Sequence, residues 1–126
     1  MTSIHIDALI WWTRDSERLV RFYRALGLPF VMEDHGDGHD HPACDIEGVH
    51  VAILQAEKGS ETPRRGEHGA TQSSFRVDDL DVVKAALMKM GELRLMIDSQ
   101  DGPWGTRIVI EDPDGRPVQV TQRTQG

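Results

Sequence analysis

The chain contains two stretches that look like one unit repeated. In the first, a strand-like run leads through Asp15 into an amphipathic segment that stops at Gly27. In the second, a similar run leads through Asp79 into a segment that stops at Gly91. Asp79 follows Asp15, and Gly91 follows Gly27, by the same number of residues. A repeat at a fixed separation indicates two copies of one supersecondary unit. A functional site is then expected at equivalent positions of the two copies.

The composition fits one compact domain, since 126 residues can bury a substantial core. No apolar run reaches membrane-spanning length, and residues 1–5 lack the basic and apolar regions of a signal peptide. A net charge of −7 with scattered Lys and Arg argues against a nucleic-acid partner. The single Cys44 suits a reducing compartment, as a small buried apolar residue rather than a nucleophile. We therefore expect a cytoplasmic protein with no membrane or nucleic-acid partner.

The spacing of apolar residues and turns predicts the order β-α-β-β-β twice. In the first copy, strands are predicted over residues 4–13, 28–33, 43–46 and 49–54. In the second copy, strands are predicted over residues 71–77, 93–97, 107–111 and 118–122. Between them lie two helices whose buried stripes are Leu19, Phe22, Tyr23 and Leu26 in the first and Leu80, Val83, Leu87 and Met90 in the second. Asp15 or Ser16 is placed to cap the first helix, and Gly27 to end it.

A polar segment separates the two copies. Residues 58–69 contain Gly, Ser, Pro and many charges without apolar periodicity, which is typical of a linker. We therefore predict module one over about residues 3–57, the linker over about 58–69 and module two over about 70–123, together forming a single domain.

Three segments resemble the recurring signatures of a known superfamily. They are Phe22-Tyr23-Arg24-Ala25-Leu26-Gly27-Leu28, Phe75-Arg76-Val77-Asp78-Asp79-Leu80-Asp81 and Asp112-Pro113-Asp114-Gly115-Arg116-Pro117-Val118-Gln119. By these segments the chain resembles the vicinal oxygen chelate superfamily, which includes glyoxalase I, bleomycin resistance proteins, fosfomycin resistance enzymes and extradiol dioxygenases. The resemblance implies an α+β fold in which two βαβββ modules form a curved mixed-sheet cup. It also implies a homodimer.

The resemblance selects four positions for metal ligands. In metal-dependent members, ligands project into the cup from the first and last strands of each module, which here selects Ala8 and Ala52 in module one and Gln72 and Gln119 in module two. Divalent ions prefer imidazole, carboxylate or thiolate, and a neutral amide is a weak donor without a charged companion. Two alanines and two glutamines do not supply that set, so we expect no metal cofactor.

The histidines offer another source of chemistry. His35, His39 and His41 surround a predicted turn, and spacing on a strand places His39 and His41 on one face. They could bridge a metal, but a solvated hairpin tip is the alternative that we prefer. His50 lies two residues from Ala52 and therefore shares its face. His50 is the candidate catalytic group, for proton transfer or ligand orientation, whereas a structural histidine bonded to a neighbour is the alternative.

The same alternation predicts a mainly apolar cup with a few amides and hydroxyls, which is typical of small-molecule pockets. Trp12 and Trp104 are candidates for stacking on a flat ligand, with core or dimer packing as the alternative for each. The predicted ligand-binding residues are Ala8, Ile10, Trp12, His50, Ala52, Gln72, Ser74, Trp104 and Gln119.

Two functional classes follow. The first is a metal-independent small-molecule binding protein of the glyoxalase/bleomycin resistance type, which holds an apolar or aromatic ligand in the cup. The second is a glyoxalase- or dioxygenase-like enzyme, a lyase, isomerase or oxygenase. It would draw a non-standard metal site from His5, His50 or the hairpin histidines, or use His50 with Glu47 as a metal-free catalyst. A regulatory or interaction role is a third possibility.

Overall fold

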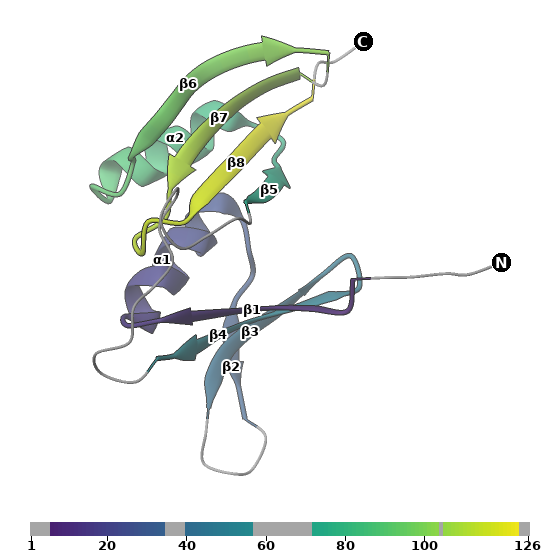
Figure 1. Cartoon of the computed structure of the whole chain (residues 1–126), viewed down its shortest axis with the longest axis vertical. Coiled ribbons are helices and arrows are strands. Elements are labelled where there is room, and N and C mark those ends of the chain that lie inside the picture. Colours follow the sequence, from purple (N-terminus) through teal and green to yellow (C-terminus); the bar gives the residue numbers. More distant parts are fainter. Residues whose placement is uncertain (1–5, 35–39, 57–71, 104, 124–126) are drawn as a thin grey trace, which may run out of the picture.

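The protein is represented by a computed structural model that describes residues 6–34, 40–56, 72–103 and 105–123. The first module contains β1 (Ala8–Thr13), α1 (Ser16–Leu26), β2 (Val31–Glu33), β3 (His41–Ile46) and β4 (Val49–Gln55). The second module contains β5 (Ser73–Arg76), α2 (Leu80–Lys89), β6 (Leu95–Gly102), β7 (Gly105–Glu111) and β8 (Pro117–Gln122). The predicted order β-α-β-β-β is confirmed in both copies (Figure 1).

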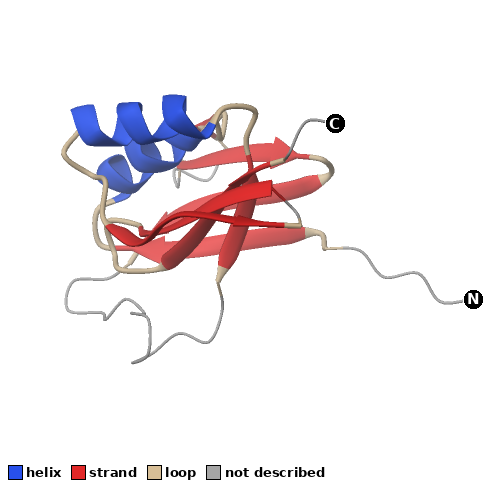
Figure 2. Cartoon of the chain, turned by 90° about the horizontal axis from the view of Figure 1, so that it is seen from above, coloured by secondary structure: helices blue, strands red, loops and turns tan. Residues whose placement is uncertain are grey.

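Each module forms its own four-stranded mixed sheet. The strand orders are β1-β4-β3-β2 and β5-β8-β7-β6, which are equivalent. In each sheet the first strand runs parallel to the last, and the remaining pairs are antiparallel. The two helices lie together on one side of the molecule, with the strands on the other (Figure 2). This confirms the predicted α+β architecture of two βαβββ modules.

The repeated Asp and Gly residues set the ends of the helices. The Asp15 carboxylate accepts a hydrogen bond from the Arg18 amide at 3.1 Å, and the Asp79 carboxylate accepts one from the Asp81 amide at 3.0 Å. Both bonds satisfy backbone donors that have no partner within the first helical turn. Gly27 follows α1 with a φ of +116°, which a side chain would strain. The repeat therefore reflects how each helix begins and ends.

One hydrophobic core joins the two modules. Tyr23 of α1 stacks on Trp11 of β1, with ring centroids 4.3 Å apart, and meets Phe75 of β5 edge-on at 6.1 Å. The fully buried side chains come from both copies and include Leu19, Phe22, Tyr23, Ile53, Leu87, Ile108, Ile110, Val118 and Val120. Burial of a large apolar side chain stabilises the folded state by about 1.5–3 kcal/mol. The predicted apolar stripes of both helices therefore form the centre of a shared core.

A buried carboxylate links the Asp-Pro-Asp-Gly turn, which precedes β8 in module two, to module one through hydrogen bonds. Asp112 is 1% exposed and accepts a hydrogen bond from the Tyr23 hydroxyl at 2.8 Å. It also accepts from Arg116 Nη1 at 3.1 Å and from the backbone amides of Asp114 and Arg116 at 2.9 Å. Arg116 in turn donates to the backbone carbonyl of Trp12. The Asp-Pro-Asp-Gly turn is thus held by the first helix and the first strand.

The structure corrects several predicted boundaries. Met90 is 39% exposed rather than buried, because α2 ends at Lys89. Strand β1 begins at Ala8 rather than residue 4, and β5 begins at Ser73, which leaves Gln72 exposed just before it. Strand β6 begins later than predicted and runs on to Gly102. The predicted linker lies outside the described residues.

Neither described helix is long and apolar enough to span a bilayer.

Candidate functional site

The first sheet has one face on the core and one face turned away from it. Trp11, Val51 and Ile53 point into the core, so strand alternation turns their neighbours to the opposite side. We call that side the open face. By register and alternation it carries Ala8, Ile10, Trp12, Val31, Glu33, His41, Ala43, Asp45, His50, Ala52 and Leu54. Ile10 and Trp12 are 54% and 56% exposed there, although both are large and apolar.

The two expected metal positions of module one lie on this open face but carry no donor. Ala8 is paired with His50, and Ala52 is paired with Ile10, across β1 and β4. A methyl side chain cannot coordinate an ion.

The expected positions of module two are also unsuited to a cation. Gln119 donates to the Ser74 hydroxyl at 3.0 Å, and its amide oxygen accepts from Arg107 Nη1 at 2.7 Å. The Arg107 Nε donates to Gln100 at 2.8 Å, which holds the guanidinium in place. A cation at Gln119 would therefore meet a fixed positive charge. Gln72 is exposed and lies outside β5, so the four family positions do not fit a divalent metal.

His50 instead takes part in a polar cluster on the open face. Its Nδ1 lies 3.0 Å from Asp45 Oδ1, and its Nε2 lies 3.1 Å from Glu33 Oε2. The hydrogen bond with Asp45 raises the pKa of His50 above its ordinary value, partial desolvation opposes the shift, and the charge of Glu33 adds to it. The side chain is 37% exposed, so solvent reaches it. His50 therefore has the partners that the structural alternative requires, and it stays accessible from solvent.

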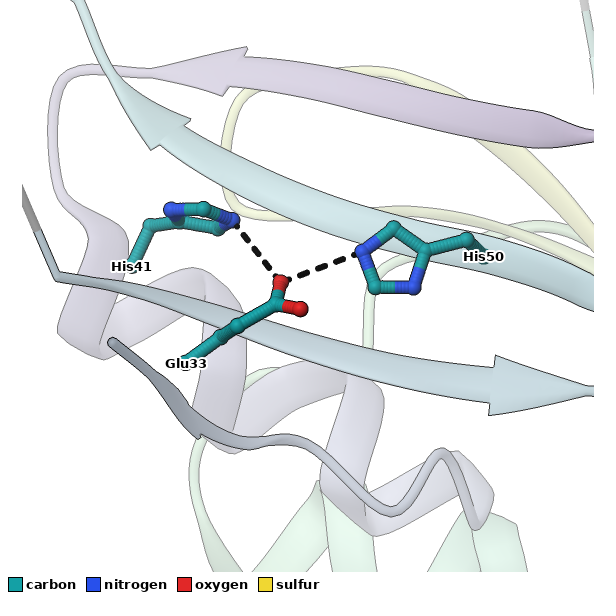
Figure 3. Close-up of side chains that lie close together, drawn as sticks. All are labelled: Glu33, His41 and His50. Carbon is teal, nitrogen blue, oxygen red and sulfur yellow. Dashed lines mark hydrogen bonds and ion pairs between the residues drawn. The ribbon is translucent and has the colours of Figure 1, made fainter. Parts of the chain in front are cut away.

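His41 completes a compact group with Glu33 and His50. Its Nε2 lies 3.2 Å from the same Glu33 oxygen, so two imidazoles approach one carboxylate from opposite sides (Figure 3). The potential ligand atoms of the three residues all lie within 4.8 Å of one another. Two imidazole nitrogens and one carboxylate oxygen suit Zn²⁺ and several other transition metals. Within the described part of the chain, this is the group whose donors could hold a metal.

Sequence reasoning identified His50 and His41 but missed their carboxylate partners. Glu47 and Gly48 both have positive φ and form a two-residue turn, which sets Asp45 opposite His50. That turn was a readable signal for Asp45. Glu33 pairs with His41 across β2 and β3, and no sequence signal gave that register.

Several predicted site residues are not brought together. His5, His35, His39 and Trp104 lie outside the described residues, so the proposed pairing of His39 with His41 stays a prediction. Ala8, Ile10, Trp12, His50 and Ala52 share the open face of the first sheet, whereas Ser74 and Gln119 are bonded to each other on the second.

A cavity of about 300 Å³ lies where the two modules meet. It is bordered by the end of α1 and by parts of β3 and β5, and its lining residues are Leu26, Gly27, Leu28, Pro29, Asp45, Ile46, Phe75, Arg76 and Val77. None of the predicted ligand-binding residues that the structure describes lines it.

Solved structures share this fold. TnmS3, an antibiotic binding protein from Streptomyces sp. CB03234, is similar at 20% identity with a TM-score of 0.68, covering 98% of this chain and 99% of that chain. The oxidase ChaP-H2 is similar at 18% identity and a TM-score of 0.72, covering 99% and 98%. A glyoxylase/bleomycin resistance protein/dioxygenase domain from Frankia sp. EAN1pec is similar at 18% identity with a TM-score of 0.73, covering 98% of this chain and 100% of that chain. At these identities the likeness shows the fold alone.

A search of curated proteins gave no match. A family model, that of the Glyoxalase/Bleomycin resistance protein/Dioxygenase superfamily, matches residues 5–120. This match spans both modules and agrees with the paired sheets described above. The chain therefore belongs to the Glyoxalase/Bleomycin resistance protein/Dioxygenase superfamily.

Proposed function

We propose that the protein binds an apolar or aromatic small molecule on the open face of the first sheet, without a metal at the four family positions. The observation that carries this proposal is the exposure of Ile10 and Trp12 beside Ala8, where the family resemblance places a metal ligand. Apolar and aromatic side chains accompanied by a few polar groups are the typical lining of small-molecule sites.

Trp12 is the expected main contact. An aromatic ligand stacked on its ring gains about 0.5–1.5 kcal/mol beyond the apolar area that becomes buried. The net charge of −7 favours neutral or cationic ligands only weakly, because it is spread over the chain. The description of TnmS3 as an antibiotic binding protein supports this class of function.

The exposed apolar side chains also support a homodimer. Ile6, Ile10, Trp12 and Val31 are each more than half exposed, and large exposed apolar patches mark binding or association sites. Light scattering coupled to size-exclusion chromatography should give twice the mass of the 14.1 kDa chain. A monomer at micromolar concentration would contradict the dimer but not ligand binding.

The binding proposal is tested with N-phenyl-1-naphthylamine, a neutral aromatic probe whose fluorescence rises in an apolar site. Binding should occur in the presence of EDTA and should weaken about tenfold or more in Trp12→Ala, which removes the stacking ring. Val82→Ala is the matched control, because Val82 is 63% exposed on α2 and lies away from the open face. Equal affinity in the parent and Trp12→Ala would contradict the proposed site.

The alternative function is a lyase, isomerase or oxygenase that uses His50. The observation that favours it is the Asp45–His50 pair, because a carboxylate on one ring nitrogen orients a histidine for proton transfer at the other. Turnover of a hemithioacetal, an epoxide or a catechol that disappears in His50→Ala would place this alternative first. Absence of turnover with all three substrate types would leave the binding function favoured.

A further inference from the structure

We propose that Glu33, His41 and His50 form a binding site for one divalent transition metal, at a place in the fold distinct from the four family positions. The donors are the Nε2 atoms of the two histidines and Oε2 of the glutamate. The three strands β2, β3 and β4 that carry them are adjacent in one sheet, so the backbone holds their spacing.

The separations of the donor atoms suit a shared ion. Glu33 Oε2 lies 3.2 Å from His41 Nε2 and 3.1 Å from His50 Nε2, and all three donors fall within 4.8 Å of one another. Ligands bound to one transition metal at about 2.0–2.2 Å lie roughly 2.8–3.6 Å apart in octahedral or tetrahedral arrangements. Small rotations of the side chains would therefore bring all three onto one ion.

Asp45 supplies a second, independent observation. It contacts His50 Nδ1 at 3.0 Å, on the opposite side of the ring from Glu33. Metal-binding histidines almost always donate their other ring N–H to a carboxylate, a carbonyl or water, which fixes the ring orientation and raises its basicity. Asp45 therefore leaves Nε2 of His50 as the donor that faces Glu33 and His41. It acts as a positioning residue rather than a ligand.

Two alanines make room for the group. Ala43 and Ala52 are paired across β3 and β4 on the open face and are 3% and 5% exposed. By register they lie between the strand positions of His41 and His50, so their short side chains let the two imidazoles lean toward each other (Figure 3). Ala52, at a position where the family resemblance places a metal ligand, thus helps to make room for a different donor set.

The donor set also selects the class of ion. Mixed nitrogen and oxygen ligands suit Zn²⁺, Fe²⁺, Co²⁺, Ni²⁺ or Cu²⁺, whereas Mg²⁺ and Ca²⁺ prefer oxygen ligands alone. Three protein donors leave at least one coordination position for water or another ligand. The side chains of His41, Glu33 and His50 are 16%, 31% and 37% exposed, so an ion can reach them from solvent.

The test titrates the untagged protein with Zn²⁺ by calorimetry and with Co²⁺ by visible absorption. One Zn²⁺ per chain is expected, with affinity at least 100-fold weaker in His41→Ala, His50→Ala and Glu33→Gln, each of which removes a donor. Gln72→Ala and Gln119→Ala are the controls. Both should bind Zn²⁺ as the parent does, because these residues lie at the family positions and are not among the proposed donors. Circular dichroism of each variant checks the fold.

Asp45→Asn provides the graded measurement, because it keeps the shape of the side chain but removes its charge. Affinity for Zn²⁺ should fall about 10–100-fold, as for other carboxylates behind a metal-binding histidine. The proposal is overturned if no stoichiometric Zn²⁺ binds, if binding survives in the donor variants, or if the glutamine variants abolish it. Binding of N-phenyl-1-naphthylamine is measured separately in EDTA, so failure of the metal site and failure of the proposed function are distinguishable.

Discussion

Substitution Tyr23→Phe tests how strongly the last turn of module two is fastened to module one. It removes one hydroxyl that donates to the buried Asp112 carboxylate at 2.8 Å. Burial and the charge of Asp112 hold the pKa of Tyr23 well above its ordinary value, so the hydroxyl stays protonated and donates at neutral pH. The ring itself remains, and with it the stacking on Trp11. The change therefore isolates a single buried hydrogen bond.

The expected loss of stability depends on the hydrogen bonds that Asp112 retains in Tyr23→Phe. Arg116 Nη1 and two backbone amides still donate to it, so the carboxylate is not left without partners. A hydrogen bond to a charged group contributes about 1.5–3 kcal/mol. We expect the free energy of unfolding to fall by about 2 kcal/mol, with Tm lower by roughly 8 °C.

Urea unfolding followed by tryptophan fluorescence measures this loss, with an unchanged m value as the sign that the native state is intact. Thr106→Val is the matched control, because it removes another hydroxyl-to-carboxylate bond, of 2.6 Å to Asp101, at an exposed site. That variant should lie within about 0.5 kcal/mol of the parent. Equal stability of the parent and Tyr23→Phe, or equal losses in both variants, would show that this buried hydrogen bond does not stabilise the fold more than an exposed one.

Two further predictions concern charge. Hydrogen bonding to Arg18 lowers the pKa of Glu92, so Glu92 stabilises the fold at neutral pH and loses this contribution as pH falls through the lowered pKa. The urea midpoint of Glu92→Gln should therefore fall less than that of the parent between neutral pH and acid; parallel curves would contradict this. Gln119→Glu should pair with Arg107 and gain no calorimetrically detectable Zn²⁺ site at the family position. A Zn²⁺ site that appears in Gln119→Glu and survives His50→Ala would contradict the unsuitability of that position.

The helices could be predicted from the sequence because their signals are local. Asp15 and Gly27 mark the two ends of α1, and the capping bond and the positive φ at these residues are what the structure shows. The buried stripe of α2 was predicted correctly except at Met90. Capping and periodicity depend on neighbouring residues, so one sequence suffices to read them.

The polar cluster could be predicted only in part, because most of its residues are brought together by the register of neighbouring strands. The two-residue turn at Glu47 and Gly48 fixes the pairing of Asp45 with His50 and was readable. The pairing of Glu33 with His41 spans a longer connection whose length does not define a register. The bond between Arg107 and Gln119 likewise depends on how β7 and β8 pair. Site residues that are brought together by strand register could therefore be identified only from the structure.

The proposed function requires the open face to bind an apolar or aromatic molecule without help from a metal. Its most direct test is a ¹H–¹⁵N NMR titration of the EDTA-treated protein with N-phenyl-1-naphthylamine. We expect saturable shifts of the backbone amides of β1 and of the Trp12 indole, with the amides of α2 unchanged. Shifts confined to the cavity at the end of α1, or binding that appears only after a divalent metal is added, would contradict it.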